Sequence, residues 1–473
     1  MQQYMQIKRQ NPGTVLLYRL GDFYETFFED AVLLSKELEL TLTGRDAGAV
    51  YGRVPLAGIP FKAINGYLEK LVQKNIRVAL CDQLEDPKFA KGLVKRGVTR
   101  IITSGTLTES DFLKQNTNNY IAAMFKDDKS ELYGFAYSDI STGEFKVTQA
   151  PLNLLMSELA RIAPAEIVAP AIRGEIKPFQ IVPEERADLP DVIVKTYNCS
   201  KIPASVFDFS MSDSNLKAVF TPASLTAFGY DKCKLGFRAA GALLAYVWES
   251  MKENVPKIER IEAYELSEYM ILDAGTRKNL ELVETMREKN KYGSLLWAID
   301  QTKTNMGARL LRNWICQPLK RVHNIMVRQR AVSELVEQSS IRVSLIEVLE
   351  KIYDIQRLST RLSNNSANPK DFLSLKASLE MLPAIRMLLG NFKAPLFKDL
   401  YDKMDALEDI YGWIHSAIEE EPPISVREGG IFKNGYHEEI DKLRQAKTEG
   451  KDWLANLEAK EKEHTGIKNL RIK

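Results

Sequence analysis

The chain has 473 residues, which at about 150 residues per domain predicts roughly three domains. Hydrophobic residues make up 45% and charged residues 27%, a composition that excludes global disorder. The four cysteines stand far apart without a CxxC or CxH pair, which argues against a disulfide framework or a zinc cluster. No apolar stretch approaches the ~20 residues of a membrane span. We therefore expect a cytoplasmic protein without a membrane segment.

The charge of the chain is nearly balanced overall but uneven along its length. The 65 basic and 63 acidic residues almost cancel, whereas positions 51–100 hold 10 basic residues against 4 acidic ones. A basic face of this kind suits contact with a polyanion such as nucleic acid, although a solvated surface is the commoner explanation.

The first hundred residues predict an α/β unit, because short β-favouring runs alternate with segments of helical spacing. Residues 15–20 predict a strand that ends at Gly21, and residues 24–40 predict a helix. A second helix is predicted for residues 63–72, and extended segments for residues 77–81 and 99–103.

A second α/β unit begins near Asn116. Its pattern is strand, strand, a turn at Gly143, strand, and then helix and strand. The predicted strands are 120–125, 132–138, 144–148 and 166–169, and the predicted helix is 153–162.

From about Pro256 strand signals fade and apolar residues recur at helical spacing, which predicts an all-α region. An apolar stripe from Leu345 to Leu362 predicts one continuous helix, with breaks expected at residues 364–369 and 419–430. The other predicted helices are 273–289, 306–315 and the highly charged segment 441–463.

At the end of the chain, Ile467, Leu470 and Ile472 predict the start of a strand that has no local partner. We therefore expect that the sequence is a fragment of a longer protein.

Residues that could carry catalysis are few. The four histidines form no HExxH or Ser/His/Asp arrangement. Gly236 and Gly241 have the glycine spacing of a phosphate loop, but no Lys-Ser/Thr follows them, so we expect no nucleotide binding by that motif. Asp139 and Glu144 could be metal ligands of a nuclease, although carboxylates around a turn are far more often plain turn residues.

The segment from Gly21 to Glu25 is the strongest candidate for binding. It follows a predicted strand and opens a predicted helix, so Phe23 would project from a rigid scaffold and could stack on a base or wedge into a duplex. Glu25 could accept a hydrogen bond from a base edge. The competing interpretation places Phe23 in the core and makes Glu25 an acid of the first helical turn.

Seven motifs, in this order and spacing, resemble the amino-terminal half of the MutS family of DNA mismatch-recognition proteins. The resemblance covers essentially the whole chain. The motifs are YRLGDFYE at 18–25, PLAGIP at 55–60, CDQLEDP at 81–87, KGLVKR at 91–96, DAGTRKNLE at 273–281, TNMGARLL at 304–311 and PISVREGG at 423–430.

The resemblance implies a multidomain fold: an α/β mismatch-binding domain over residues 1–115, an α/β connector of ribonuclease H-like fold over 116–253, and an all-α core or lever over 254–450. Residues 451–473 would begin the clamp. The resemblance also implies that ATP and magnesium bind only in a carboxy-terminal ATPase domain beyond these residues. The chain would then be a DNA-binding module and not itself an enzyme.

Residue roles follow from the matching motif positions. In the family, the aromatic residue that matches Phe23 stacks on the mispaired base, and the carboxylate that matches Glu25 hydrogen-bonds that base. The positions expected near the DNA backbone or minor groove are Arg45, Gln83 and Arg96. Those expected near phosphates, from the local positive charge, are Lys88, Lys91, Lys95 and Arg100.

The partners implied by the resemblance are mismatched double-stranded DNA, MutL through the connector, and a second copy of the full-length protein, in a bacterial cytoplasm and at the nucleoid. Two alternatives stay open. One is a MutS-like protein of recombination or junction binding, against which the pair Phe23 and Glu25 argues. The other is a metal-dependent nuclease that uses Asp139 and Glu144 of the connector.

Overall fold

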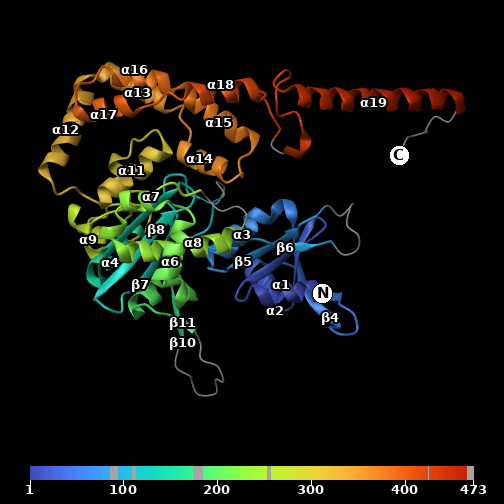
Figure 1. Cartoon of the computed structure of the whole chain (residues 1–473), viewed down its shortest axis with the longest axis horizontal. Coiled ribbons are helices and arrows are strands. Elements are labelled where there is room, and N and C mark those ends of the chain that lie inside the picture. The colour runs from blue at the N-terminus through green and yellow to red at the C-terminus, as the bar shows by residue number, and fades with distance from the viewer. Residues whose placement is uncertain (86–93, 109–112, 174–184, 253–256, 424–425, 466–473) are drawn as a thin grey trace. The chain divides into compact units, whose positions relative to one another are not determined.

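The structure is a computed structural model that describes residues 1–85, 94–108, 113–173, 185–252, 257–423 and 426–465. It divides into two compact units, each described by itself below. The first comprises Met1–Val332 with Asp354–Ser366, and the second comprises Ser333–Tyr353 with Ala367–Lys473. Figure 1 shows two α/β domains along the first part of the chain and helices along the rest.

The first domain is built on a six-stranded sheet with the order β3-β4-β2-β1-β5-β6. Neighbouring strands are antiparallel except for β1 and β5, which are parallel. The strands are β1 (Val15–Leu20), β2 (Phe23–Phe27), β3 (Thr43–Asp46), β4 (Arg53–Pro60), β5 (Val78–Gln83) and β6 (Arg96–Ile102).

Helices cover both faces of this sheet, one face more fully than the other. On one face α2 (Phe28–Leu38) and α3 (Ile64–Gln73) pack against strand residues such as Leu17 and Ile59. On the other face α1 (Gln2–Gln10) packs through Tyr4 and Ile7 against Leu16 and Phe27. The segments predicted at 15–20, 63–72, 77–81 and 99–103 agree with β1, α3, β5 and β6.

The helix predicted from Tyr24 is wrong over its first turn, because Phe23–Phe27 forms strand β2 and the helix starts at Phe28. Leu20 pairs with Phe23 across a two-residue turn in which Gly21 has φ +59°. A positive φ at this place is the geometry of a tight hairpin, and glycine adopts it without steric cost. Pairing on both sides, with β1 and β4, outweighs the local helical pattern.

The second domain is built on a seven-stranded sheet, with the order β11-β10-β7-β8-β9-β13 and β12 paired with β10. Its last strand, β13, pairs with β9 and lies beyond residue 253, so the sheet extends past the connector limit expected from the sequence. The strands are β7 (Tyr120–Lys126), β8 (Leu132–Asp139), β9 (Glu144–Pro151), β10 (Glu166–Arg173), β11 (Glu185–Ala187), β12 (Cys199–Pro203) and β13 (Glu262–Ala263).

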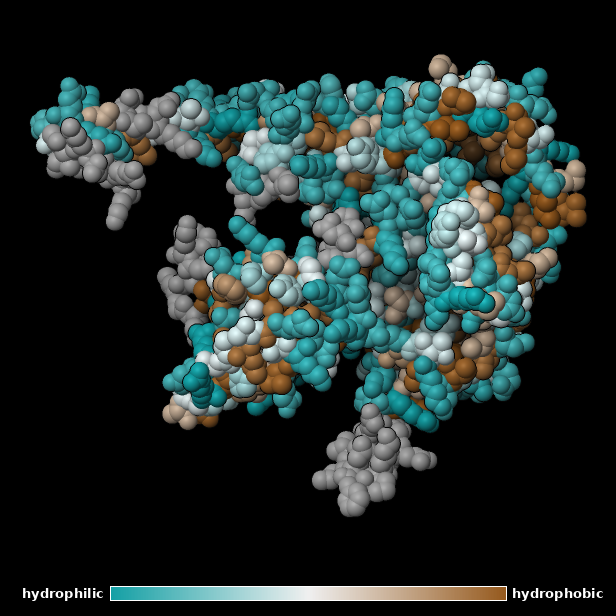
Figure 2. Space-filling model, turned by 180° about the vertical axis from the view of Figure 1, so that it is seen from behind, coloured by the Kyte–Doolittle hydropathy of each residue, from teal (hydrophilic) through white to brown (hydrophobic). Residues whose placement is uncertain are grey.

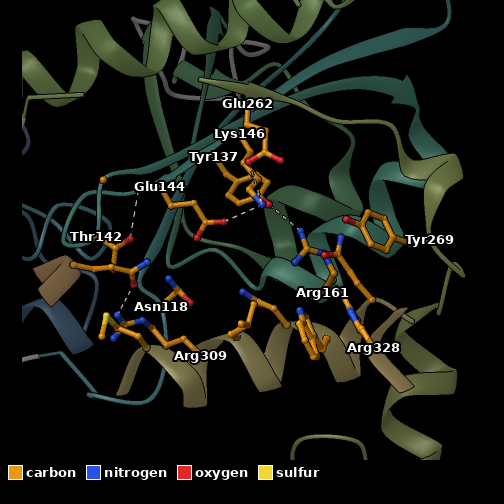
Figure 3. A pocket seen from close by; sticks show the side chains of 17 residues that line it. Asn118, Tyr137, Thr142, Glu144, Lys146, Arg161, Glu262, Tyr269, Arg309 and Arg328 are labelled. Atoms are coloured by element: carbon orange, nitrogen blue, oxygen red, sulfur yellow. Dashed lines mark hydrogen bonds and ion pairs between the residues drawn. The ribbon is translucent and has the colours of Figure 1, made fainter. Parts of the chain in front are cut away.

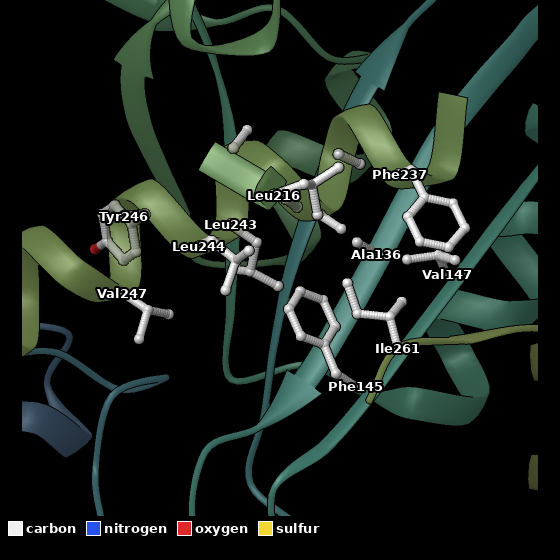
Figure 4. Packing of buried hydrophobic residues seen from close by; sticks show 14 of the residues in the cluster. Ala136, Phe145, Val147, Leu216, Phe237, Leu243, Leu244, Tyr246, Val247 and Ile261 are labelled. Atoms are coloured by element: carbon white, nitrogen blue, oxygen red, sulfur yellow. The ribbon is translucent and has the colours of Figure 1, made fainter. Parts of the chain in front are cut away.

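Helices pack on both faces of the second sheet as well. Leu155 and Leu159 of α4 contact the face that carries Phe135. The opposite face, which carries Phe145, packs against α8, as Figure 4 shows for Leu243 and Leu244. The helices of this domain are α4 (Leu152–Ile162), α5 (Asp191–Thr196), α6 (Phe209–Lys217), α7 (Pro222–Ala227) and α8 (Lys234–Met251).

The two glycines with phosphate-loop spacing lie inside helix α8. A Cβ atom on Gly236 would come within 2.8 Å of the Thr148 carbonyl oxygen, and one on Gly241 within 2.4 Å of the Ser212 carbonyl oxygen. Both glycines therefore allow α8 to pack closely on β9 and α6. Gly241 lies in the middle of the helix, where backbone N–H groups bond to carbonyls of the preceding turn and cannot cradle a phosphate. In the first turn, beside Gly236, the Leu235 N–H donates to Gln149 Oε1 and the Phe237 N–H donates to the Cys233 carbonyl oxygen.

The helical part of the first unit differs from the sequence expectation in two places. The helix predicted for residues 273–289 is limited to α9, and turns follow it, with Glu281 at φ +46°. The single helix predicted from Leu345 to Leu362 is also wrong. Its residues belong to α13 in the second unit and α14 in the first, because Asp354 caps a new helix by accepting a hydrogen bond from the Arg357 N–H. The helices are α9 (Ala274–Asn279), α10 (Leu295–Ile299), α11 (Asn305–Cys316), α12 (Val322–Glu337, in part in each unit) and α14 (Ile355–Ser363).

The second unit is helical throughout its described elements. Asn368 and Asp371 form a capping box with Pro369 at the first position of α15, which accounts for the break predicted at 364–369. The charged helix predicted for residues 441–463 is confirmed within α19, whereas the strand predicted at 467–472 lies outside the described residues. The helices are α13 (Ser339–Leu349), α15 (Pro369–Glu380), α16 (Leu382–Leu389), α17 (Pro395–Lys403), α18 (Glu408–Ala417) and α19 (Glu438–Thr465).

Two buried arginines in the helical part of the first unit hold the segment that joins the two sheets. Arg309 is 3% exposed; it donates to both carboxylate oxygens of Asp354, at 2.6 and 2.9 Å, and to the Gln115 carbonyl oxygen at 3.1 Å. Arg357 donates to the carbonyl oxygens of Lys114 and Thr117. Side chains of α11 and α14 thus satisfy the backbone of the interdomain linker.

We expect Asp354→Ala to destabilise the first unit by roughly 3–5 kcal/mol, since it leaves buried Arg309 without its counter-charge. Urea-induced unfolding followed by circular dichroism measures the change. Glu131→Ala is the matched control, because the Lys126–Glu131 pair is exposed on both side chains and should contribute less than about 1 kcal/mol. Equal effects of the two substitutions would contradict the role of Asp354.

The same carboxyl predicts a pH dependence. Burial by itself raises the pKa of Asp354, but hydrogen bonds from Arg309 hold the pKa below its usual value. The stabilisation is therefore present above about pH 4 and is lost as the pH falls through the lower pKa of the folded state. Urea midpoints of the wild-type protein and of Asp354→Asn should accordingly converge between pH 7 and pH 3; a constant difference would contradict the assignment.

Candidate nucleic-acid interface

Phe23 and Glu25 project from the same face of the first sheet, because alternate residues of a strand point to the same side. Phe23 is 47% exposed, whereas Tyr24 between them is 3% exposed and packs into the opposite face. Phe23 pairs with Pro60, and Glu25 pairs with Gly58, both on β4. The expectation that Phe23 projects from a rigid scaffold holds, but the scaffold is a β-hairpin and not the start of a helix.

Hydrogen bonds hold strand β2 and its turn in place. The Tyr24 hydroxyl donates to Asp82 Oδ1 at 2.6 Å, and Thr99 donates to the other oxygen of Asp82 at 2.7 Å. Burial, followed by the bond to Asp82, raises the pKa of Tyr24, so the hydroxyl stays protonated as a donor. At the turn, the Arg19 guanidinium donates to the Gly21 carbonyl oxygen, and the Phe61 N–H donates to the Asp22 carbonyl oxygen.

Glu25 forms an ion pair with Arg45. Arg45 lies on β3, and its Nη1 atom is 3.0 Å from Glu25 Oε2. The side chain of Glu25 is 20% exposed and that of Arg45 is 52% exposed. Both groups are therefore accessible to a ligand that approaches this face of the sheet.

Arg96 and Gln83 lie at the other end of the same face. They pair with each other at the ends of β6 and β5. The Arg96 guanidinium lies 5.1 Å from the centre of the Tyr18 ring and donates to the Arg19 carbonyl oxygen at 2.9 Å. Tyr18 pairs with Glu25 in the register of β1 and β2, so Phe23, Glu25, Arg45 and Arg96 share one face, which we call the β2 face.

The other basic residues expected near DNA are not all on the β2 face. Arg100 pairs with Leu80 on the opposite face and donates to the Thr106 carbonyl oxygen. Lys95 is exposed just before β6, and its backbone N–H donates to Glu85. Lys88 and Lys91 lie outside the described residues.

Exposure of apolar side chains does not by itself single out Phe23. In Figure 2 the domain with the six-stranded sheet, at the lower left, shows hydrophobic residues among hydrophilic ones. Val32, Leu33 and Phe61 of this domain are also at least 38% exposed. What distinguishes Phe23 is its place beside a carboxylate at the tip of an anchored hairpin.

The residues of the nuclease alternative form a turn. Asp139 is fully buried, and its carboxylate accepts hydrogen bonds from Asn118, Asn119 and Ser141. Glu144 accepts a bond from the Tyr120 hydroxyl, lies 3.3 Å from Lys146, and lines a polar cavity of about 470 Å³ (Figure 3). Within the described residues, no group of three or more His, Cys, Asp or Glu side chains could hold a metal ion. These contacts favour the turn interpretation.

Comparisons with known proteins agree with this architecture. The family model for MutS domain I matches residues 1–111, that for MutS domain II matches residues 119–259, and that for MutS domain III matches residues 275–471. The chain belongs to the MutS family. The multidomain fold expected from the sequence, α/β domains followed by a helical region, is thereby confirmed.

Relatives at high identity carry the same family name. DNA mismatch repair protein MutS of Lachnoclostridium phytofermentans is 44% identical over 474 residues, covering 100% of this chain and 50% of the relative. The MutS proteins of Acetivibrio thermocellus and Symbiobacterium thermophilum are 44% and 43% identical, covering 100% and 99% of this chain and 53% of each relative. The chain thus spans about half the length of the curated relatives it matches. These names do not favour the recombination or nuclease alternatives.

Among the described residues, no helix combines the length and apolar character needed to cross a membrane. The Tyr24–Asp82 bond and the Glu25–Arg45 pair were not predicted from the sequence, since both join residues that are far apart in the chain. One local feature of the sequence does indicate the hairpin of β1 and β2. The Gly-Asp pair at 21–22 stands between two runs rich in β-favouring residues, 15–20 and 23–27, which is typical of a hairpin.

The two phenylalanines of β2 give a matched test of the wedge assignment. Phe27→Ala, at a position 3% exposed, should cost roughly 3–5 kcal/mol of stability because it leaves a cavity. Phe23→Ala should cost less than about 1 kcal/mol because its ring faces solvent. Thermal and urea unfolding of both variants measure the difference. A large loss of stability for Phe23→Ala would place Phe23 in the core.

Proposed function

We propose that the chain recognises mismatched or unpaired bases in double-stranded DNA and so begins mismatch repair. The observation that carries the proposal is the exposed ring of Phe23 beside the carboxylate of Glu25 on one anchored strand. Membership of the MutS family and relatives named for DNA mismatch repair support it.

The proposed reading of DNA is indirect. Inserting an aromatic wedge from the minor groove unstacks a base step, which costs a few kcal/mol in a paired duplex. A mismatched step stacks and pairs poorly, so the same insertion costs less there. A rigid support is needed because a mobile ring would lose entropy on insertion, and the hydrogen bonds around Tyr24 and Gly21 supply that support.

Glu25 adds a polar contact to the wedge. Its carboxylate stands two residues from Phe23 on the same face, so a base beside the inserted ring would come within its reach. A carboxylate accepts hydrogen bonds from base donors such as an imino or amino N–H. An unpaired guanine or thymine offers its imino N–H as such a donor, whereas pairing occupies that imino group.

Basic and polar side chains of this domain would hold the DNA backbone in a fixed position on the protein. Arg45, Gln83 and Arg96 lie on the β2 face, and we propose that they contact the DNA backbone or minor groove. We propose that Lys95, which is exposed just before β6, contacts phosphates, and the same role for Lys88, Lys91 and Arg100 rests on the local positive charge alone. For Arg100, its position on the opposite face argues for an indirect contribution.

The remaining functions of the family are proposals for the longer protein. We propose that ATP and magnesium bind outside these residues, that the full-length protein forms a homodimer, and that the connector contacts MutL. The length of the relatives, about twice that of this chain, supports the first of these, and the homodimer and the MutL contact rest on the family resemblance alone. The bacterial origin of those relatives supports action in the cytoplasm, on the nucleoid.

Phe23→Ala should weaken binding to a mismatched duplex by about 1–3 kcal/mol, as expected for the loss of one base–aromatic stack. Binding to a paired duplex should change little, because phosphate contacts dominate it. Fluorescence anisotropy with two labelled duplexes that differ only at the mismatch measures the affinity ratio.

Phe209→Ala is the control for this experiment, because it removes a 54% exposed phenylalanine from the connector and should leave the affinity ratio unchanged. If Phe23→Ala also leaves the ratio unchanged while its melting temperature is that of the wild-type protein, the proposed function is wrong.

A further inference from the structure

We infer that Arg45 is an exchangeable counter-ion of Glu25 and that their ion pair determines how strongly the protein discriminates against paired DNA. This inference rests on the proposed function and deepens it. It assigns to Arg45 a role that depends on Glu25, beyond that of an independent phosphate contact.

The geometry joins the two side chains directly. Arg45 Nη1 lies 3.0 Å from Glu25 Oε2, and within the described part of the chain Arg45 is the one side chain that hydrogen-bonds to Glu25. Glu25 pairs with Gly58 on the intervening strand β4, so the β4 residue directly opposite the carboxylate carries no side chain, while Arg45 pairs with Val54 and reaches Glu25 diagonally across β4. The carboxylate that shares the β2 face with Phe23 is therefore paired with a cation in the free protein.

The ion pair between Arg45 and Glu25 is weak enough for a ligand to displace it. Arg45 is 52% exposed, and an exposed ion pair contributes only about 0–1 kcal/mol, so a competing ligand can replace it. The guanidinium has five N–H donors and binds phosphate as well as carboxylate. One cation on the β2 face can therefore serve either Glu25 or a DNA phosphate.

Paired and mismatched DNA favour different partners for Arg45. A paired step keeps its imino N–H groups inside the base pair and offers Glu25 none of them, so Arg45 stays on Glu25, because otherwise the carboxylate would face phosphates without compensation. A mismatched base donates to Glu25 and releases Arg45 to a phosphate. The mismatch complex therefore gains two contacts together, which increases discrimination beyond the base contact alone.

The salt dependence of binding to paired DNA tests this exchange. Each phosphate contact adds about 0.9 to the slope of log affinity against log salt. Glu25→Gln should free Arg45 for a phosphate and raise the slope for paired DNA by about one, equal to a roughly threefold larger loss of affinity between 50 and 200 mM salt. In the Arg45→Gln background, Glu25→Gln should leave the slope unchanged.

Glu37→Gln supplies the matched control. Glu37 and Lys74 form an exposed ion pair of similar geometry, at 2.7 Å, on α2 and just after α3, which pack on the opposite face of the sheet. This substitution removes the same charge from the same domain and should leave the slope unchanged. A slope raised equally by Glu37→Gln would show a general effect of net charge and would overturn the inference.

Two further outcomes are distinct. If Glu25→Gln raises the slope equally with and without Arg45, the carboxylate only repels DNA, and the exchange is wrong although mismatch recognition stands. If the wild-type protein binds paired and mismatched duplexes equally, the proposed function fails, while the comparison on paired DNA still decides whether Arg45 is exchanged. Melting temperatures equal to that of the wild-type protein confirm that each variant is folded.

Discussion

The first unit depends on guanidinium groups buried beside backbone carbonyls. Arg309 and Arg357 satisfy the carbonyl oxygens of residues 114–117, which a linker between two sheets would otherwise present to solvent or leave unpaired. Asp354 forms ion pairs with both guanidinium groups, the closer one with Arg309, and also caps α14. The same set of contacts therefore orders a helix, neutralises buried charge and fixes the path of the chain between the domain that carries Phe23 and the connector.

The local sequence pattern was sufficient to predict elements whose partners lie close in the chain. The hairpin of β8 and β9, helix α4 and the charged helix α19 were predicted because their apolar spacing and turn residues are all local. One prediction failed where distant residues decide. Pairing with β4 makes a strand of residues 23–27. The break between α13 and α14 has a local cause, the capping of α14 by Asp354, and was overlooked within the apolar stripe.

The residues of the candidate site were likewise predicted only in part. Phe23 and Glu25 were identified from a short segment, and the structure places both on the β2 face. The partners of that segment could not be found from spacing, since Arg45 is 20 residues from Glu25 and Asp82 is 58 residues from Tyr24. Family resemblance selected Arg45 as a residue near DNA, but only the sheet register shows that it neutralises Glu25.

Strand β13 determines where the second domain can be cut when it is expressed alone. Glu262 and Ala263 cover the edge of β9, Thr148 donates to the Tyr264 carbonyl oxygen at 2.9 Å, and the Tyr264 hydroxyl donates to buried Glu158 at 2.6 Å. The second domain expressed alone and cut at residue 253 would present an open strand edge to neighbouring molecules, and buried Glu158 would lose one of its hydrogen-bond donors. Recombinant versions that retain the chain through Tyr264 keep this edge closed, which favours a monodisperse preparation over aggregation.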